Sequence, residues 1–234
     1  MTVEECENPR QIWERRYSRM RAADVRPNVD PWLERWLLQL AAAQNMPVLE
    51  LGCGSGQDTR YLVDHGFRVI AGDYSRSALW TARESAVQAA FVQFDLRDGL
   101  PFPHETFPVI IAGLCLHYFS QAKTQRIVAE IRDRLRPGGY LLVRVNSVRD
   151  VHHGAVGHAE IEPGCYLVNG ALKHFFDADD LRALFANGWR MHHLEERTIH
   201  RYQNPKVVWE MLVEKAMLYQ GIQYYSEKPF YTTE

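Results

Sequence analysis

Between residues 47 and 146 the sequence alternates short apolar segments with segments of helical periodicity. The apolar segments, rich in β-branched residues, are "PVLEL", "RVIAGD", "FVQFD", "PVIIAGLCL" and "YLLVRVNS". Helices are predicted over "QDTRYLVDHG", which Gly66 ends, over Ser75–Val87, which Ser75 caps, and over Gln121–Leu135. Buried strands that alternate with amphipathic helices are typical of a parallel sheet with helices on both faces. The predicted fold is therefore a doubly wound, mostly parallel α/β sheet.

Further elements are predicted on both sides of this core. A helix is expected from Asp30, which would cap it. "DADDLRALFANG" predicts a short helix with Asp177 as its cap and Gly188 as its end. "WRMHHLEERTIHRY" and "KVVWEMLVEKA" indicate two long strands that turn at Asn204–Pro205 and add an antiparallel edge to the sheet. Residues 149–175 show no clear element, and a loop or insertion of this length is often functional.

Composition and charge narrow the classes of function. The net charge is -2 and the pI is about 6.6, so no overall basic field favours nucleic acid as a partner. The four cysteines form no CxxC pair and indicate reduced thiols. The first residues contain no apolar segment of a secretory signal, and no apolar run approaches the ~18 residues of a membrane span. We therefore expect a cytoplasmic protein without a membrane partner.

The loop after the first predicted strand, "LGCGSG", places glycine at Gly52, Gly54 and Gly56. Glycines at this point allow backbone N–H groups to approach a ligand closely. A dinucleotide fingerprint is G-x-G-x-x-G, whose third glycine would stand at Gln57. Glu50, just before the loop, would repel a diphosphate and could anchor an ammonium group. The loop therefore favours a cationic, nucleoside-like ligand without phosphates.

Two further carboxylates follow the next two strands. Asp73 closes the second strand about twenty residues past the glycines, where it could accept hydrogen bonds from both ribose hydroxyls. Asp95 closes the third strand and could accept from an exocyclic amine of a base, with the Leu96 N–H available to a ring nitrogen. Because the strands are parallel, we expect Glu50, Asp73 and Asp95 on one edge of the sheet, around one ligand.

These residues bring out a resemblance to the class I S-adenosylmethionine-dependent methyltransferases. The matching stretches, in the family's order and spacing, are "VLELGCGSG", "VIAGDYS", "FDLRD", "VIIAGLCLHYF" and "LRPGGYLLV". The resemblance implies a seven-stranded sheet with an antiparallel last strand and S-adenosylmethionine as cofactor. Within the class, "WERRY", "GSGQDTRYL" and "HFFDADDL" resemble the small-molecule branch that includes tellurite and thiopurine methyltransferases.

The resemblance also implies roles for individual residues. Glu50 and the glycine loop would hold the methionine part, Asp73 the ribose, and Asp95 with Leu96 the adenine. The expected cofactor site consists of Glu50, Gly52, Cys53, Gly54, Gly56, Asp73, Tyr74, Asp95, Leu96, Gly113 and Leu114. The last two residues follow the fourth strand and would line the sulfonium side.

Catalysis at a sulfonium methyl group depends mainly on orientation, because the methyl is already electrophilic. A general base is needed only for an acceptor that arrives protonated with a high pKa. His117, in "CLHYF", is the candidate base, with a packing role as the alternative. Trp13 and Tyr17 could cover a sulfonium through cation–π contact or could pack an N-terminal helix. Tyr118 and His174 are further candidates for the substrate side.

The expected organisation is one methyltransferase domain over residues 1–234. Its parts are an N-terminal helical cap (1–45), the cofactor-binding core (46–146), a substrate-side loop or insertion (147–176), and a C-terminal helix, hairpin and aromatic tail (177–234). The sequence leaves the oligomeric state open.

The predicted function is transfer of a methyl group from S-adenosylmethionine to oxygen, nitrogen, sulfur or a heavier chalcogen of a small molecule. A protein methyltransferase and a non-catalytic binding protein with this fold are the alternatives. A nicotinamide oxidoreductase is disfavoured by Gln57 and Glu50. Nucleic acid is disfavoured because no Asn/Asp-Pro-Pro-aromatic tetrad follows the fourth strand. No metal site is predicted, since His152, His153 and His158 match no ordinary zinc spacing with Cys165.

Overall fold

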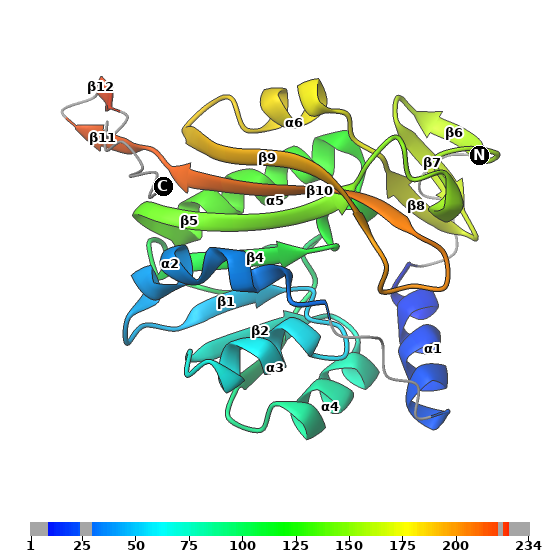
Figure 1. Ribbon diagram of the computed structural model, residues 1–234, viewed down its shortest axis with the longest axis horizontal. Coiled ribbons are helices and arrows are strands. Elements are labelled where there is room, and N and C mark those ends of the chain that lie inside the picture. The colour runs from blue at the N-terminus through cyan, green and yellow to red at the C-terminus, as the bar shows by residue number, and fades with distance from the viewer. Residues whose placement is uncertain (1–8, 24–29, 220–221, 225–234) are drawn as a thin grey trace, which may run out of the picture.

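The computed structural model describes residues 9–23, 30–219 and 222–224 (Figure 1). In this part of the chain, seven strands form one sheet in the order β3-β2-β1-β4-β5-β10-β9. Their bounds are β1 Val48–Leu51, β2 Val69–Asp73, β3 Ala90–Gln93, β4 Phe107–Gly113, β5 Leu135–Asn146, β9 Trp189–Ile199 and β10 Lys206–Lys215. The first five strands pair in parallel, and β10 is antiparallel to both β5 and β9. The predicted seven-stranded, mostly parallel sheet with an antiparallel C-terminal hairpin is confirmed.

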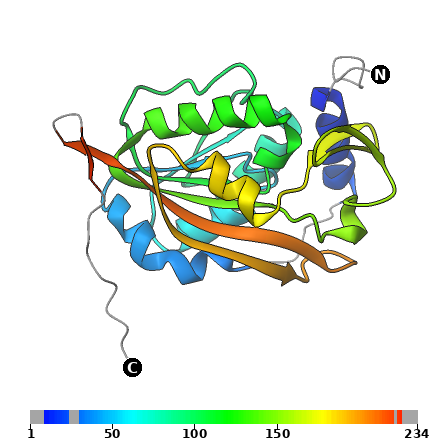
Figure 2. The same ribbon diagram turned by 90° about the horizontal axis from the view of Figure 1, so that it is seen from above.

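Helices cover both faces of this sheet. On one face lie α5 (Gln121–Arg134) and α6 (Ala178–Leu184), and on the other lie α3 (Gln57–Asp64), α4 (Arg76–Ser85) and the segment before β1 (Figures 1 and 2). Successive side chains of a strand point to opposite faces. Accordingly, Ile110 of β4 joins the apolar cluster under α5, whereas the next residue joins the cluster under α3 and α4.

Two predicted helix caps form as expected. The Ser75 hydroxyl accepts a hydrogen bond from the backbone N–H of Ala78 at 3.1 Å and begins α4. Asp177 begins α6 in a capping box, in which its carboxylate accepts from the Asp180 N–H at 2.9 Å and the Asp180 carboxylate accepts from the Asp177 N–H. At both positions the local sequence is sufficient to predict where the helix begins.

The segment before β1 differs from the prediction. It forms a 3-10 turn, η2 (Trp32–Trp36), a single α-turn, α2 (Leu37–Leu40), and another 3-10 turn, η3 (Ala41–Ala43). Asp30 does not cap a helix, because its carboxylate pairs with the guanidinium of Arg144 on β5. The cap prediction was therefore wrong.

The region predicted as a loop or insertion contains regular structure. A 3-10 turn, η5 (Val151–His153), is followed by a small antiparallel sheet in the order β6-β7-β8. Its strands are β6 Ala159–Glu162, β7 Cys165–Val168 and β8 Ala171–His174. These strands have only four residues each and mixed burial, so they lack the apolar signature of the main sheet.

Helix α1 (Pro9–Ala22) stands across the carboxyl ends of the parallel strands, below the small sheet in Figure 1. Its Glu14 carboxylate accepts hydrogen bonds from the Ser75 hydroxyl at 2.7 Å and from the Ser77 hydroxyl at 2.5 Å. These bonds attach α1 to the start of α4. The N-terminal part of the molecule therefore encloses the strand ends.

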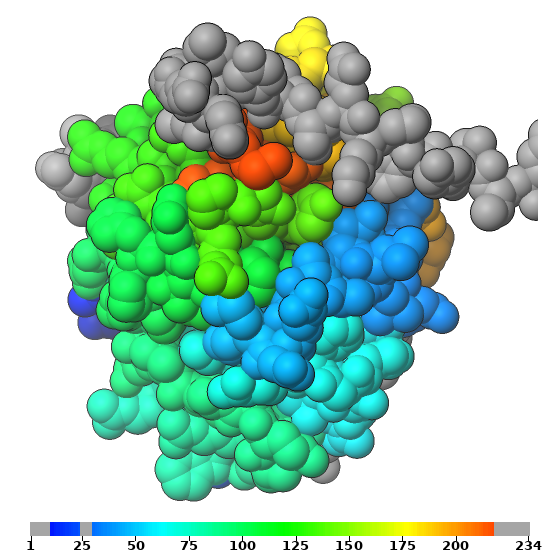
Figure 3. All heavy atoms as spheres, turned by 90° about the vertical axis from the view of Figure 1, so that its left-hand side faces the viewer, coloured from blue at the N-terminus to red at the C-terminus, as the bar shows by residue number. Residues whose placement is uncertain are grey.

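The opposite end of the sheet faces the viewer in Figure 3. The segment before β1 (blue), the start of β5 (green) and the end of β10 (orange) come together there. After β10, β11 (Met217–Tyr219) pairs with β12 (Ile222–Tyr224), and the rest of the aromatic tail lies outside the described residues. None of the described helices is both long and apolar enough to cross a membrane.

Candidate functional site

Two adjoining cavities open at the carboxyl ends of β1 to β4, beneath α1. The first has a volume of about 260 Å³ and is lined by Glu50 and most of the glycine loop. The second has a volume of about 100 Å³ and is lined by Asp73 and Asp95. Both cavities share the side chains or backbone of Trp13, Tyr17, Gly52, Leu114 and Tyr118. Ligands of open α/β sheets bind at this edge.

The glycine loop requires glycine at two positions. Gly52 has φ +63° and Gly54 has φ +55°, both in the left-handed region. A Cβ atom on Gly52 would lie 2.6 Å from Cβ of Cys115, and one on Gly54 would lie 2.5 Å from the hydroxyl oxygen of Tyr17. The Tyr17 side chain of α1 therefore lies directly on the loop, as a cover over the first strand turn.

Glu50 lies buried at the start of the loop. Its carboxylate accepts a hydrogen bond from the Thr59 hydroxyl at 2.5 Å. Burial raises the pKa of Glu50 well above its usual value, and the nearby charge of Asp58 raises it further. Both carboxylates line the first cavity. An ammonium group placed there would offset the cost of burying the negative charges of Glu50 and Asp58. This end of the cavity therefore suits the cationic amine of an amino acid.

Asp73 joins the glycine loop to the end of β2. Its carboxylate accepts from the Gly54 N–H at 2.9 Å and from the Ser75 N–H at 2.8 Å. Burial raises its pKa to about 6 in spite of these bonds. Each carboxylate oxygen can accept a further hydrogen bond, because a carboxylate offers about four lone-pair sites in total. The remaining capacity faces the second cavity, where hydroxyl donors would fit.

Asp95 is held by two arginines. Arg97 donates from its backbone N–H at 2.9 Å and from its guanidinium at 2.6 Å, and Arg10 of α1 donates at 2.7 Å. Burial raises the pKa of Asp95, but these hydrogen bonds outweigh it and bring the value to about 2. The contact with Arg10 ties α1 to the third strand end. Asp95 is predicted to accept from an exocyclic amine, and in the structure Arg97 and Arg10 lie beside it as further donors.

Leu114 follows β4 with φ +59°, which a non-glycine residue rarely adopts. Its N–H donates to the Arg144 carbonyl at 2.9 Å, and the residue lines both cavities. Strained backbone of this kind concentrates at functional sites. Gly113 before it lines the first cavity, where a Cβ would lie 3.0 Å from a carboxylate oxygen of Asp58.

Of the other predicted cofactor residues, most line a cavity and one supports the packing of the helices. Cys53 lines the first cavity, and burial raises the pKa of its thiol well above the usual value. Tyr74 and Leu96 line the second cavity. Gly56 lines neither: a Cβ there would lie 2.7 Å from that of Ala82, so this glycine allows α3 to approach α4.

His117 lies on a 3-10 turn, η4 (Leu116–Tyr118), and lines the first cavity. Only 1% of its surface is exposed, and its Nδ1 atom has no hydrogen-bond partner in the described part of the chain. Burial lowers its pKa well below the usual value, and the charges of Lys206 and Lys173 lower it further. The imidazole is therefore neutral, as a proton acceptor must be.

The remaining substrate-side candidates separate into two groups. Trp13, Tyr17 and Tyr118 come together at the boundary of the cavities, where the Trp13 ring meets the Tyr118 ring edge-on at 4.7 Å between centroids. His174 is not brought to them. It stacks on Phe176 at 3.9 Å and lines a different cavity, so its predicted position on the substrate side is corrected.

The sequence reading missed a group of cationic residues in the first cavity. They are Arg16 of α1, Lys173 of β8, Lys206 of β10 and Arg201 of the β9–β10 turn. The local sequence does not mark these positions, because each lies in a segment that only the folding of the chain brings to the first cavity. Among the described residues, no group of three or more His, Cys, Asp or Glu side chains could hold a metal ion.

Comparisons with known proteins bear on this geometry. Residues 48–139 match a family model described as a methyltransferase domain. This range contains the glycine loop, Asp73 and Asp95, and it ends within β5. The match therefore covers the part of the chain that builds the walls of both cavities on the sheet side.

Three curated relatives match part of the chain. An uncharacterized methyltransferase from Synechocystis sp. is 37% identical over 103 residues, or 44% of this chain and 48% of that protein. Trans-aconitate 2-methyltransferase from Delftia acidovorans is 30% identical over 112 residues, or 47% and 41%. tRNA N(3)-cytidine methyltransferase from Xenopus tropicalis is 26% identical over 157 residues, or 62% and 47%. The chain thus spans less than half the length of these relatives.

Solved structures share the fold. A protein from Methanosarcina mazei described as an S-adenosylmethionine-dependent methyltransferase has a TM-score of 0.66, with 20% identity over 80% of this chain and 98% of that chain. 1,6-didemethyltoxoflavin-N1-methyltransferase from Burkholderia thailandensis, solved with S-adenosylhomocysteine, has a TM-score of 0.58, with 21% identity over 77% and 75%. With the family match over residues 48–139, these likenesses confirm the predicted class I methyltransferase fold.

Proposed function

We propose that this chain, whose core is a methyltransferase domain, binds S-adenosylmethionine across the two cavities and transfers its methyl group to a small-molecule acceptor. The observation that carries the proposal is the convergence of Glu50, Asp73 and Asp95, at the ends of three successive strands, on two cavities that share one aromatic wall. Together the cavities approach the lower end of the ~300–1,000 Å³ that ligand pockets occupy.

Each part of the cofactor has residues that suit it. Glu50 and Asp58 would hold the ammonium group, Asp73 the ribose hydroxyls, and Asp95 with the Leu96 N–H the adenine. The guanidinium of Arg201, which contacts Gln57 and lies near Asp58, suits the carboxylate of the methionine part. When bound, S-adenosylmethionine supplies an electrophilic methyl group.

The chain itself would contribute orientation and enclosure. Trp13, Tyr17 and Tyr118 stand between the ammonium end and the adenosine end, so their faces can stabilise a sulfonium by cation–π contact. Helix α1 excludes water from the same place, which strengthens electrostatic contacts there. His117 is neutral, and its Nδ1 atom has no hydrogen-bond partner within the described ranges, so it can accept a proton from a protic acceptor. Acceptors that arrive as anions would not need it.

A small-molecule acceptor fits an enclosed cavity between α1, the small sheet and the hairpin turn. The relative from Delftia acidovorans, named for trans-aconitate, supports this choice. The relative from Xenopus tropicalis is named for tRNA and makes nucleic acid the competing acceptor. The narrower likeness to tellurite and thiopurine methyltransferases, and the division of residues 1–234 into cap, core, insertion and hairpin, belong to the same proposal.

Calorimetry with S-adenosylmethionine tests the proposal directly. Asp73→Ala removes the acceptor of two ribose hydrogen bonds, each worth roughly 1.5–3 kcal/mol, so affinity should fall by at least tenfold. The matched control is Asp64→Ala, which removes an exposed carboxylate of α3 that pairs with Arg60. Equal affinity in the native protein and in Asp73→Ala would overturn the ribose assignment. Failure of the native protein to bind would overturn the cofactor itself.

A further inference from the structure

We propose that the acceptor carries an anionic oxygen group, a carboxylate or a phosphate, which binds to a cation cluster formed by Lys173, Lys206 and Arg16. The inference rests on the proposed function, because it names the acceptor class of the same site. The three side chains come from β8, β10 and α1, segments far apart in the sequence, and all line the first cavity. In Figure 1 these elements surround the carboxyl ends of the parallel strands.

The cation cluster has a positive excess. The Lys206 ammonium pairs with Asp150 at 2.7 Å, and both side chains are buried. Lys173 donates to the His153 carbonyl oxygen at 3.0 Å, and the Arg16 guanidinium lies over the Trp13 ring at 4.9 Å. Asp150 is thus the carboxylate that pairs with this cluster in the described part of the chain. One negative charge faces three positive ones.

The three cations line one cavity of about 260 Å³, so they lie close enough to act together. Burial lowers the pKa of Lys173 to about 8, and the charges of Lys206 and Arg16 add to that effect, while Asp150 opposes it. The pKa of Lys206 is lowered by burial as well, although its bond to Asp150 raises it. Partly buried like charges are costly unless an opposite charge joins them. A bound anion would supply that charge.

His117 provides a second pointer to a ligand at the same place. Among the described residues its buried Nδ1 atom has no hydrogen-bond partner, although buried polar atoms are nearly always hydrogen-bonded. Its electrostatic neighbours include Lys206 and Lys173. A ligand held by the cation cluster would therefore lie beside an imidazole that still has a hydrogen bond to make.

The first cavity consequently has two ends of opposite charge. Glu50 and Asp58 form the acidic end, which suits the ammonium of the cofactor. Glu50 and Asp58 come from β1 and α3, whereas the cation cluster comes from β8, β10 and α1, so the two sets of charges enter the cavity from different elements. Arg201 belongs to the acidic end, because its guanidinium contacts Gln57. The anion site is therefore on the acceptor side of the cavity.

The test is binding of anionic probes, measured by calorimetry on the full chain without cofactor. The probes are succinate, citrate and inorganic phosphate, with triethyl citrate as the uncharged counterpart. Lys173→Met should weaken binding of at least one anion by roughly tenfold or more, and triethyl citrate should not bind. Lys173→Arg should retain binding. Lys215→Met is the matched control, because that lysine pairs with Glu105 outside the cavity.

The probes also separate the two anion types, since selective binding of succinate or citrate indicates a carboxylate and selective binding of phosphate indicates a phosphate. The proposal is overturned if no anion binds, if triethyl citrate binds as well as citrate, or if Lys173→Met binds anions like the native protein. Binding of unfractionated tRNA that depends on Lys173 would also overturn it in favour of a nucleic-acid acceptor. Titration with S-adenosylmethionine on the same sample distinguishes the two proposals. Cofactor binding without anion binding refutes the anion site alone. Anion binding without cofactor binding refutes the proposed function and, with it, the assignment of the anion as methyl acceptor.

Discussion

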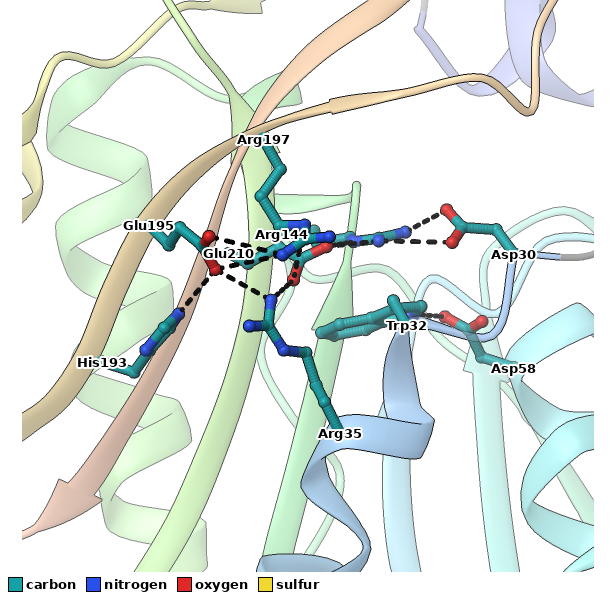
Figure 4. A network of polar contacts seen from close by, with 9 residues as sticks. All are labelled: Asp30, Trp32, Arg35, Asp58, Arg144, His193, Glu195, Arg197 and Glu210. Carbon is teal, nitrogen blue, oxygen red and sulfur yellow. Dashed lines mark hydrogen bonds and ion pairs between the residues drawn. The ribbon is translucent and has the colours of Figure 1, made fainter. Parts of the chain in front are cut away.

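Two regions of this molecule bury several charged side chains, and they differ in how those charges are matched. The first region is a network around Arg144 and Glu210, on β5 and β10, drawn in Figure 4. The second is the cation cluster in the first cavity, in which Lys206 is buried, Lys173 is partly buried and Arg16 is exposed. Both regions include a residue of β10, and both combine residues from segments that are distant in the sequence.

In the network every guanidinium meets a carboxylate. Arg144 donates to Glu210 at 2.9 Å and also to Asp30, and Arg35 donates to Glu210 at 2.8 Å and to Glu195 at 2.9 Å (Figure 4). The network attaches the segment before β1 to the strands behind it. Its charges are matched within the protein and leave no excess for a ligand.

In the cation cluster Asp150 pairs with Lys206 and its charge also reaches Lys173, whereas the Arg16 guanidinium lies over the Trp13 ring. Buried ions are tolerated when the protein itself completes their pairing, and they are costly otherwise. The comparison teaches that burial of charge alone does not identify a binding site. An excess of one charge does identify a binding site, because it leaves an interaction that a ligand can complete.

The largest expected effect concerns the matched network. Glu210→Gln leaves Arg144 and Arg35 without their shared buried carboxylate, which should destabilise the protein by about 3–5 kcal/mol. Urea denaturation measures the change. Glu195→Gln, on a carboxylate that is much more exposed, should cost below about 1 kcal/mol. Equal losses in the two variants would contradict the view that the network depends on its buried centre.

A smaller effect is expected where the network meets the cofactor site. Trp32 lies under Arg144, at 4.7 Å from guanidinium carbon to ring centroid, and its Nε1–H donates to Asp58 at 2.9 Å. Trp32→Phe removes this bond, which is worth about 1.5–3 kcal/mol divided between stability and cofactor affinity. The pKa of Asp58 rises without it, so the ammonium end weakens.

Trp80→Phe is the matched control, because Trp80 donates to Glu84 on the exposed face of α4. Denaturation and calorimetry with S-adenosylmethionine should both leave this variant near the native protein. A Trp32→Phe variant with native stability and native affinity would show that the network and the cofactor site are independent.

The pH dependence of anion binding sharpens the comparison further. The pKa of Lys173 lies at about 8, so its ammonium is charged below that pH and loses its charge above it. Affinity for citrate should be level between about pH 7, where citrate is fully ionised, and pH 8, and should then fall by up to about tenfold per pH unit. Lys173→Arg keeps its charge, because arginine does not titrate in this range, and should extend the level part of the profile.

The neighbouring imidazoles should not disturb this profile. The pKa values of His117 and His153 are both lowered, chiefly by burial, so both rings are neutral as the pH passes 8. Lys206 and Arg16 repel the Lys173 ammonium, whereas Asp150 stabilises it. Calorimetric titrations over this pH range measure the effect, and an identical profile in Lys173→Arg would remove Lys173 from the anion site.

The smallest expected effect concerns the attachment of α1. Glu14→Gln replaces a half-buried carboxylate that accepts from Ser75 and Ser77 with a neutral amide. The loss should stay below about 1 kcal/mol, because the contact is partly open to solvent. Relative to the native protein, hydrogen exchange should become several-fold faster in residues 9–22. It should stay unchanged in α5, which Glu14 does not touch. Unchanged exchange in α1 would show that its other contacts, such as the one between Arg10 and Asp95, are sufficient to hold this helix.

Sequence reasoning was sufficient where local chemistry decides the structure. Ser75 and Asp177 cap their helices as predicted, and the apolar strands form the expected mostly parallel sheet with its antiparallel hairpin. It failed at Asp30, whose carboxylate is captured by Arg144 more than one hundred residues away. No local pattern records such a partner.

The candidate site divides in the same way. Glu50, Asp73 and Asp95 could be located because each follows a strand of the predicted sheet. Lys173 was missed and His174 was chosen in its place, although the two are adjacent on β8. Because neighbouring strand residues point to opposite sides, only one of them can enter the first cavity. The prediction required a strand that the sequence did not reveal.

A crystal structure of the protein with S-adenosylhomocysteine tests the central claim most directly. The account predicts the ribose hydroxyls on Asp73, the adenine beside Asp95 and Leu96, and the ammonium group at Glu50, with the sulfur between Tyr17 and Tyr118. A ligand bound elsewhere, or one in these cavities that makes no contact with Asp73 and Glu50, would contradict it.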